Sequence, residues 1–534
     1  MAAGTMAEPA GISAWSEEAL PSLGGRAYSQ TGREGRLRGT LMKLSTLVKC
    51  AVGSGVGLAG LMLAAPTVAL AAPAWGGGPC TQAALVAAVN AANAAGGGTI
   101  NLARGCHYRL KTADNGENGL PVVMTRIWVN GNDATVDGTG AVRVFEVDGP
   151  GGNLSLRDVT ITGGSADIGG GIENVGGTVA LSNSRVTGNT ATQAGGGIAS
   201  ATCDPSSVAS LTLNRSQVSR NSQTLAPNPS GQGGGLGGGG IISILGTVTL
   251  SKSAVDRNTA QGLVGGGIAS GDYINFSGTS SFLTVDKSEV DNNSAPNAGG
   301  GGIQNLLGMV TVSKSEVDGN TSLNGGGISS GPGNGGAPGA TSQLVVTKSE
   351  VDGNTAVAPV PQPGSMAGPP IAAGGIANGG NAVLNSTEVD NNTASFTSGA
   401  GIVNHGTMTL NKSEVNGNTA AGSGVFASGG GIISAQGQPG SVPTTLTLNN
   451  SVVKNNTAGG DGGGIANGIP LPGPMPLIGG ALTLNHSKVT GNTAGILGGG
   501  IFNNGGPVTL TASSVTRNTP DNCAPPGTIS GCTG

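Results

Sequence analysis

The chain has 534 residues, of which 103 are Gly and 28 are Pro, while charged residues make up 10% and aromatic residues 2%. An average globular chain has about 7% Gly, about 5% Pro and about 25% charged residues. The net charge of −4 excludes a nucleic-acid binder that works by phosphate neutralisation, and the scarcity of aromatics argues against stacking platforms for bases or sugar rings. So much Gly and Pro is typical of low complexity unless the Gly residues recur periodically, and here they do.

The first 71 residues contain no part of the expected fold. Residues 42–71 are typical of a signal peptide, because Lys43 and Lys49 precede an apolar stretch that ends in small residues at Ala71. Residues 1–41 are either a disordered extension or an over-long reading of the gene start. A permanent membrane span is the alternative for the apolar stretch, which is interrupted by several Gly residues. We expect a secreted protein, extracellular or associated with the cell wall, with no membrane span in the mature chain.

Five of the six cysteines follow this leader. Export favours disulfides, and the simplest pairing closes a local loop at each end of the chain, joining Cys80 to Cys106 and Cys523 to Cys532. Cys203 is left over. We expect it to be a buried or loop thiol rather than a nucleophile, because no His lies near it in the sequence.

Internal repetition is the strongest pattern in the sequence. Eleven segments share one frame, as in Val248–Asn258: an apolar residue, usually Thr, then Leu or Val, two residues, Ser or Thr, one residue, Val, two residues and Asn. The spacing never slips inside this frame, and a degenerate copy at 154–164 precedes the eleven. Each copy follows a Gly-rich turn that ends in an aliphatic residue, as in Gly498–Ile501.

The frame predicts short stacked strands. Alternation of apolar residues with Thr has the period of a strand with one buried face, and we expect three such strands in each repeat. Gly and Asn suit the turns because they tolerate left-handed backbone angles. The expected fold is all-β, a solenoid of about 12 coils, in which stacking aligns one buried Asn per coil and each amide bonds to the coils above and below. This ladder comprises Asn189, Asn221, Asn258, Asn293, Asn320, Asn354, Asn392, Asn418, Asn456, Asn492 and Asn518.

The two ends of a solenoid must be covered. Thr81 is a suitable N-cap for a helix over residues 82–94, so residues 72–110 form the expected N-terminal cap. The β-helix itself is then expected over 111–520, and a disulfide-closed end over 521–534.

The repeats resemble those of the chlamydial polymorphic outer membrane proteins, whose motifs are Gly-Gly-Ala-Ile and Phe-x-x-Asn. The corresponding motifs in this sequence are Gly-Gly-Gly-Ile, as in 169–172, and Val-x-x-Asn. The chain therefore resembles the right-handed parallel β-helices of the pectin-lyase-like superfamily, over about residues 80–520. Phe is uniformly Val, and no autotransporter barrel follows the repeats, so the resemblance implies a secreted or surface-exposed solenoid without outer-membrane anchoring.

Many members of that superfamily cleave acidic polysaccharides, but the catalytic motif sets of polygalacturonase-like and pectate-lyase-like enzymes do not occur here. The three histidines, His107, His405 and His486, are expected to be surface residues rather than general bases. We expect no catalytic residue and a non-catalytic role in adhesion, binding or structure, with a polysaccharide or another cell-surface component as partner. The alternative is a carbohydrate-active enzyme, a polysaccharide lyase or glycosidase, with an atypical carboxylate site.

A recurring Lys-Ser-Glu-Val motif predicts columns of like charge on the surface. One column contains Glu and the other Asp, and the repulsion in each is expected to be offset by the neighbouring lysines at 252, 287, 314, 348 and 412. The main expectation is a solvated, self-neutralised face, with no cofactor. The alternative is weak divalent-cation binding, with Ca²⁺ as the ion, by Glu289, Asp291, Glu316, Asp318, Glu350 and Asp352.

Overall fold

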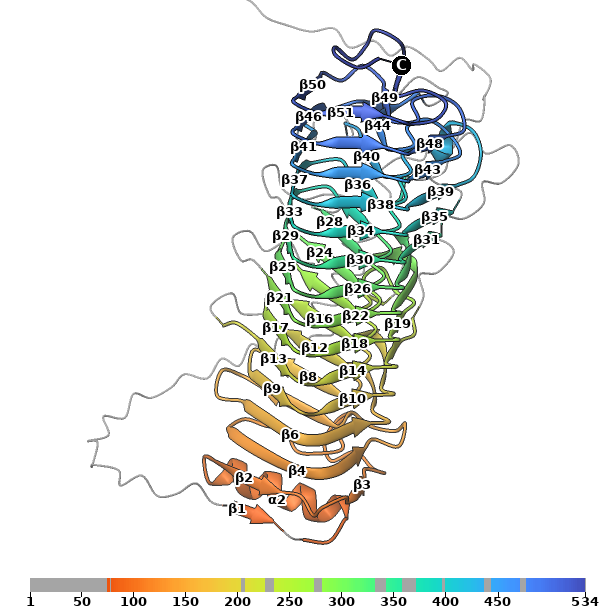
Figure 1. The fold of residues 1–534 in the computed structure, drawn as a ribbon. Helices are drawn as coiled ribbons and strands as arrows, with labels where there is room; N and C mark the ends of the chain where they lie inside the picture. Colours follow the sequence, from red (N-terminus) through yellow and green to blue (C-terminus); the bar gives the residue numbers. More distant parts are fainter. Residues whose placement is uncertain are drawn as a thin grey trace, which may run out of the picture.

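The structure is a computed structural model, and it describes residues 74–76, 78–202, 207–225, 235–272, 281–331, 342–357, 371–395, 399–436, 443–470 and 477–533. The extension, the signal peptide and Cys203 lie outside the described residues. The described chain forms one rod of stacked coils, with the single α-helix at one end and the C-terminus at the other (Figure 1). The expected all-β parallel solenoid with an N-terminal helix is confirmed.

Each coil contains four short strands rather than the three expected. In the coil that begins with β17 (Thr247–Ser251), they continue with β18 (Ala254–Asp256), β19 (Thr259–Ala260) and β20 (Ile268–Gly271). The strand missing from the prediction is β19, which follows the ladder Asn where Asn-Thr-Ala recurs in the sequence. Every strand of this coil pairs in parallel with the matching strand of the next coil.

The first two strands of each coil share one 27-stranded sheet. Its first row is β1 (Ala74–Gly76), β2 (Gly97–Asn101), β4 (Arg126–Asp137), β6 (Asn153–Thr162), β9 (Thr178–Ser182), β13 (Ser210–Asn214), β17, β21 (Phe282–Asp286), β25 (Met309–Ser313), β29 (Gln343–Thr347), β33 (Asn381–Asn385), β37 (Thr407–Asn411), β41 (Thr445–Asn449), β46 (Ala481–Asn485) and β50 (Val508–Thr511). Its second row is β3 (His107–Arg109), β10 (Arg185–Thr187), β14 (Gln217–Ser219), β18, β22 (Glu289–Asp291), β26 (Glu316–Asp318), β30 (Glu350–Asp352), β34 (Glu388–Asp390), β38 (Glu414–Asn416), β42 (Val452–Lys454), β47 (Lys488–Thr490) and β51 (Ser514–Thr516).

The third and fourth strands form two further sheets, of 11 and 14 strands. The third strands are β7 (Ser165–Ile168), β11 (Thr190–Ala194), β15 (Ser222–Gln223), β19, β23 (Ser294–Gly299), β27 (Thr321–Asn324), β31 (Thr355–Val357), β35 (Thr393–Ser395), β39 (Thr419–Ala421), β43 (Thr457–Ala458) and β48 (Thr493–Ala494). The 14-stranded sheet contains β5 (Phe145–Asp148), β8 (Ile172–Val175), β12 (Ile198–Ala201), β16 (Ile241–Ile244), β20, β24 (Ile303–Leu306), β28 (Ile328–Gly331), β32 (Ile376–Asn378), β36 (Ile402–Asn404), β40 (Ile432–Ser434), β44 (Ile465–Ile469), β45 (Leu477–Ile478), β49 (Ile501–Asn503) and β52 (Cys523–Ala524). Among the paired strands, β45 alone runs antiparallel to its neighbour, β44.

The core consists of aliphatic columns that run along the rod. The Ile that follows each Gly-rich turn and the Val two residues after the Ser or Thr of the frame are buried in coil after coil. One continuous cluster therefore extends from the helix to the C-terminal residues. In the last coil Ile501 and Val515 are still buried, whereas Val508 and Leu510 of β50 are half-buried because no further strand pairs with β50 among the described residues.

The buried asparagines bond each coil to its neighbours. The side-chain Oδ1 of Asn320 accepts hydrogen bonds from the backbone N–H of Asn293 at 2.9 Å and from its Nδ2 at 3.0 Å. The Nδ2 of Asn320 donates to the carbonyl of Val290 at 2.7 Å and to the Oδ1 of Asn354 at 3.0 Å. The same pattern joins the asparagines from Asn189 to Asn518, so polar groups that stacking removes from water are satisfied across coils.

The Gly-rich turns pack directly against this ladder. A Cβ at Gly267, the third Gly of its turn, would lie 2.7 Å from the carbonyl oxygen of Gly302 and 2.8 Å from Nδ2 of Asn293. Gly300, the first of its turn, has φ +68°, which favours Gly. The Gly-Gly-Gly-Ile motif therefore exists because the turns and the ladder are in close contact.

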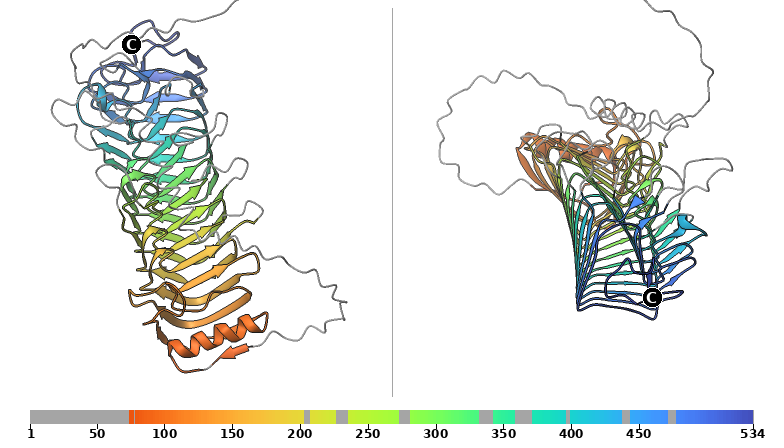
Figure 2. Two further views of the ribbon diagram at one scale, coloured as in Figure 1. Left: turned by 180° about the vertical axis from the view of Figure 1, so that it is seen from behind. Right: turned by 90° about the horizontal axis from the view of Figure 1, so that it is seen from above.

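The two ends are built as the sequence predicts. Helix α2 (Gln82–Ala94) begins at Thr81, whose side chain accepts from the backbone N–H of Ala84, and it buries Leu85, Val89 and Ala92 against the first coils. Disulfides join Cys80 to Cys106 and Cys523 to Cys532. Two views in Figure 2 show the helix closing one end of the rod and the C-terminal residues lying at the other. Across the residues described, the helices are too short or too polar to cross a membrane.

We expect Asn354→Leu to lower the free energy of unfolding by about 2–4 kcal/mol, because the backbone N–H of Asn320 then has no acceptor in the core. Denaturant unfolding of the full chain, followed by circular dichroism, measures this change. Asn90→Ala, on the exposed side of α2, serves as the control and should change the stability by less than about 0.5 kcal/mol. Equal effects of the two substitutions would contradict a structural role for the ladder.

Candidate functional site

A groove of about 680 Å³ runs along the outside of the rod, across successive coils from β4 to β22. It follows the junction between the first and second strands of each coil. One side carries Arg215, Lys252 and Lys287, and the other carries Arg185, Gln217 and Glu289. Because the coils stack about 4.8 Å apart, the groove repeats the same kinds of side chain at that period.

The side chains of the first wall stand at a left-handed bend of the backbone. Lys252 has φ +52° and Lys287 has φ +49°, and the corresponding residue of most other coils also has positive φ. Left-handed angles cost a non-Gly residue on the order of 1 kcal/mol, and Lys has no side-chain preference for them. The sequence predicts left-handed angles at Gly and Asn, so the bend at these lysines was not predicted.

A row of buried serines forms the floor of the groove. Ser216, Ser253 and Ser288 are each at most 5% exposed. The Oγ of Ser288 accepts from the backbone N–H of Ser253 at 3.0 Å and donates to the carbonyl of Asp286 at 2.8 Å. The serine hydroxyls thus hydrogen-bond to the backbone at the bend. The charged side chains of the walls are the groups that a ligand in the groove would contact.

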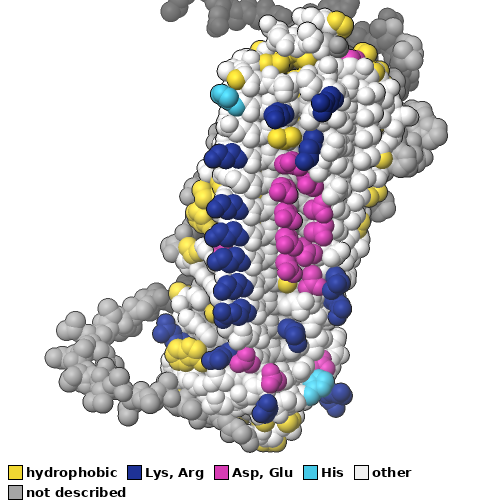
Figure 3. Space-filling model, in the orientation of Figure 1, with side chains coloured by type: hydrophobic (Ala, Val, Ile, Leu, Met, Phe, Trp, Pro, Cys, Tyr) yellow, Lys and Arg dark blue, Asp and Glu magenta, His cyan; other side chains and the backbone are white. Residues whose placement is uncertain are grey.

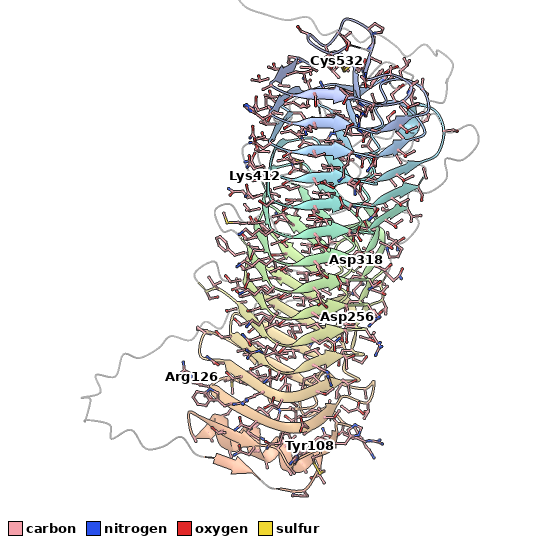
Figure 4. The ribbon with its side chains drawn as sticks, viewed as in Figure 1. Tyr108, Arg126, Asp256, Asp318, Lys412 and Cys532 are labelled. Carbon is pink, nitrogen blue, oxygen red and sulfur yellow. A yellow bond between two sulfur atoms is a disulfide. The ribbon has the colours of Figure 1, made fainter. Side chains whose placement is uncertain are left out.

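Two parallel sets of charges begin in the walls of the groove, at Lys252, Lys287 and Glu289, and continue past it along the same face, shown in blue and magenta in Figure 3. We call Lys252, Lys287, Lys314, Lys348 and Lys412 the lysine column. The acidic stripe is the double column of carboxylates on β18, β22, β26, β30, β34 and β38: Asp256, Asp291, Asp318, Asp352, Asp390, Glu289, Glu316, Glu350, Glu388 and Glu414. In Figure 4, Lys412 lies near one edge of this face, and Asp318 and Asp256 lie toward the other.

Among the residues that the structure describes, the lysine column forms no ion pair with the acidic stripe. Within the described ranges, the one ion pair of the lysine column joins Lys287 to Asp286, at 3.8 Å, and Asp286 lies outside the acidic stripe. Ion pairs reach the acidic stripe only at its ends, where Arg257 lies 2.8 Å from Asp256 and Lys454 lies 2.7 Å from Glu414. The left-handed bend at each Lys accounts for the missing ion pairs, because Lys and the Glu two residues later then lie on opposite walls of the groove.

Burial, with repulsion from neighbouring carboxylates adding to it, raises the pKa of aspartates in the acidic stripe. Burial, together with the charges of Glu289, Asp318 and Glu316, raises the pKa of Asp291 to about 7. Burial, with Glu414 and Glu388 adding to it, raises the pKa of Asp390 to about 6.

The six carboxylates proposed as cation ligands lie on β22, β26 and β30, with Glu over Glu and Asp over Asp. In the part of the chain that the structure describes, no three His, Cys, Asp or Glu side chains are grouped closely enough to hold a metal ion. Ca²⁺ binding at these positions stays a prediction.

The histidines lie apart from one another. His107 Nε2 is 3.0 Å from Asp137 Oδ2 in the N-terminal cap, and His486 occupies the left-handed position that Lys fills elsewhere. Nδ1 of His405 is 2.9 Å from the carbonyl oxygen of Ala435, and burial lowers the pKa of His405.

Sequence analysis missed one charged cluster near the N-terminal cap. Arg143 is 4% exposed, and its guanidinium lies within 3.1 Å of the carboxylates of Glu117, Glu146 and Glu173. It also donates to the carbonyl of Ile168. No motif predicts this cluster, since its members come from different coils outside the repeat frame, and its contacts fasten the first coils together.

No protein-family model matches the chain, and no curated protein matches it. Among solved structures, the chain is similar to the crystal structure of PfbA, a surface adhesin of Streptococcus pneumoniae, with 11% sequence identity and a TM-score of 0.29. The match covers 81% of this chain and 89% of that chain. A likeness at this TM-score carries no argument for the present chain, and its own side chains must suggest its function.

The stability of the rod should fall as the pH rises. Asp291 has an ordinary pKa of 3.8 when unfolded and a pKa of about 7 when folded, so the folded state binds its proton more tightly. This contribution is fully present below about pH 4 and is lost as the pH rises through about 7. After allowance for solvent screening, we expect a loss of about 1–2 kcal/mol between pH 5 and pH 8, measured by denaturant unfolding.

Asp291→Asn should flatten this pH dependence, because an amide does not titrate. Asp114→Asn, an exposed position outside the acidic stripe, serves as the control and should leave the slope unchanged. An Asp291→Asn variant with the slope of the parent chain would show that Asp291 titrates normally.

Proposed function

We propose that the chain is a secreted, non-catalytic β-helix that binds a polysaccharide along the groove on its charged face. The observation that carries this proposal is the shape of the groove, which extends over successive coils instead of closing into a pocket. A row of equivalent side chains about 4.8 Å apart matches a ligand that also repeats. A compact small molecule would contact only one or two coils.

Four basic side chains, Arg185, Arg215, Lys252 and Lys287, line the groove against three acidic ones, Asp133, Asp158 and Glu289. This small excess of positive charge favours a polymer with anionic groups. Arg185, Arg215 and Lys252 line it, and none of them has an ion-pair partner among the described residues. Arginine and lysine bind carboxylate and sulfate groups through charge-assisted hydrogen bonds. Gln217 and Asn183 add amide groups that suit sugar hydroxyls.

Two disulfides support a location outside the cell, where thiols stay oxidised. The rod offers a long, regular surface that suits adhesion or a structural role in the cell envelope. A tagged protein recovered from the cell-wall fraction, rather than from the medium, would support attachment over diffusion.

The second candidate is a carbohydrate-active enzyme with its acid in the acidic stripe. The observation that favours it is the pKa of about 7 for Asp291, which lies close to the carboxylates of Glu289, Asp318 and Glu316. A glycosidase needs such a pair, one carboxyl protonated and one charged, about 5–10 Å apart.

We expect the full chain to bind polygalacturonate at low ionic strength and to bind neutral dextran at least tenfold more weakly. The double variant Arg215→Ala/Lys252→Ala should bind polygalacturonate at least tenfold more weakly than the parent chain, since each lost charged contact costs about 1.5 kcal/mol. Isothermal titration calorimetry measures both affinities. Arg109→Ala, exposed on β3 outside the groove, is the matched control.

Equal binding of the charged and neutral polymers, or an unchanged affinity of the double variant, would contradict a polymer site in the groove. The same samples are assayed for release of reducing sugar and of unsaturated uronate. Turnover that Asp291→Asn abolishes would replace the binding proposal with the enzymatic one.

A further inference from the structure

The lysine column and the acidic stripe leave two sets of charge unneutralised on one face of the same molecule. Apart from Lys287, the members of the lysine column make no ion pair within the residues the structure describes, and the interior members of the acidic stripe make none either. The contacts that the interior aspartates do make are hydrogen bonds, such as Asn391 Nδ2 to Asp352 Oδ1 at 2.9 Å. Each set therefore lacks a counter-charge that the chain itself could provide.

The two sets are matched in the four coils that contain the Lys-Ser-Glu motif; the coil of Lys252 has Ala254 in place of Glu, and the coil of Glu388 has Ser386 in place of Lys. Lys287 and Glu289, Lys314 and Glu316, and Lys348 and Glu350 are each separated by a single Ser, and this spacing is the same in every Lys-Ser-Glu copy. Strand pairing places Glu289, Glu316, Glu350, Glu388 and Glu414 in register along the rod. The lysine column and the acidic stripe thus run parallel at a constant separation, with no insertion between them (Figure 3).

We propose that this face binds the same face of a second copy of the chain, with the two rods parallel and related by a twofold axis along the rod. Such an axis keeps every coil at its own height and exchanges the two walls. The lysine column of one copy then lies opposite the acidic stripe of the other, and the reverse contact forms at the same time. A twofold axis generates both contacts from one self-complementary patch, as in most homodimers.

An antiparallel pair does not achieve this match. A twofold axis perpendicular to the rod and lying in the interface puts the lysine column opposite the lysine column and the acidic stripe opposite the acidic stripe. Like charges across an interface repel, so electrostatics selects the parallel arrangement. The dimer goes beyond the binding of a polymer in the groove and is tested with no polymer present.

The association depends on the number of aligned pairs and on salt. Exposed ion pairs are individually weak. Salt weakens them further, because charges more than a Debye length apart, about 8 Å at physiological ionic strength, are largely screened. Several pairs of Lys and Glu in register, each formed twice, allow a dimer that is stable at low salt and dissociates at high salt.

Sedimentation of the full chain tests the proposal by charge reversal. We expect a dimer at low ionic strength whose Kd rises at least tenfold in 0.5 M NaCl. The variants K287E/K314E/K348E and E289K/E316K/E350K should each be monomeric, because the contacts of three neighbouring coils become repulsive. An equimolar mixture of the two variants should form a heterodimer, since both contacts then pair opposite charges.

A control and a milder variant keep the result interpretable. R104E/R109E/K111E makes the same change in net charge at exposed positions of the N-terminal cap and should dimerise as the parent chain does. If charge reversal disturbs folding, K287Q/K314Q/K348Q should still raise the Kd at least tenfold. Carbodiimide cross-linking of mixed ¹⁴N and ¹⁵N chains should join Lys314 of one copy to Glu316 of the other, which reports the parallel register.

A parent chain that is monomeric at low salt would overturn the proposal. So would reversed variants that dimerise like the parent, or a mixture of them that stays monomeric. Cross-links between coils at opposite ends of the two rods would overturn the parallel orientation.

Discussion

The stacking register is the constraint on which the rest of the structure depends. Each buried Asn bonds to the coil before and the coil after it, so a coil that slipped by one residue would leave amide and carbonyl groups unpaired in the core. The Gly-rich turns favour this register, because a shift by one residue would bring a side chain to positions such as Gly267, where it would clash with the ladder. The polar interior therefore fixes the position of every coil, which the aliphatic columns alone would not do.

The same constraint determines the outer surface. When every coil has the same register, a residue repeated in the sequence becomes a column on the rod, whatever its charge. The Glu residues of five successive coils and their Asp neighbours are thereby held side by side, although their charges repel one another. Part of the stability provided by the core offsets this repulsion, which adds to burial in raising the pKa values of Asp291 and Asp390.

Sequence reasoning succeeded where a single periodic signal decides the outcome. The strand frame, the Asn ladder, helix α2 with its Thr81 cap and the two disulfides follow from spacing and residue type alone. It failed where the backbone departs from residue preference or where partners are far apart in sequence. The left-handed lysines belong to the first group, and the contacts of Arg143 belong to the second.

Protonation links the stability of the rod to what its charged face can bind. A cation brought close to Asp291 lowers the pKa of that carboxyl, so binding at neutral pH releases a proton that the isolated face retains. Raising the pH therefore has opposite effects on the two properties: it destabilises the free rod by charging the acidic stripe, and it strengthens the attraction of that stripe for cations. A partner that provides lysines in register would lower the pKa of Asp291 and remove part of the cost that the register imposes on the acidic stripe.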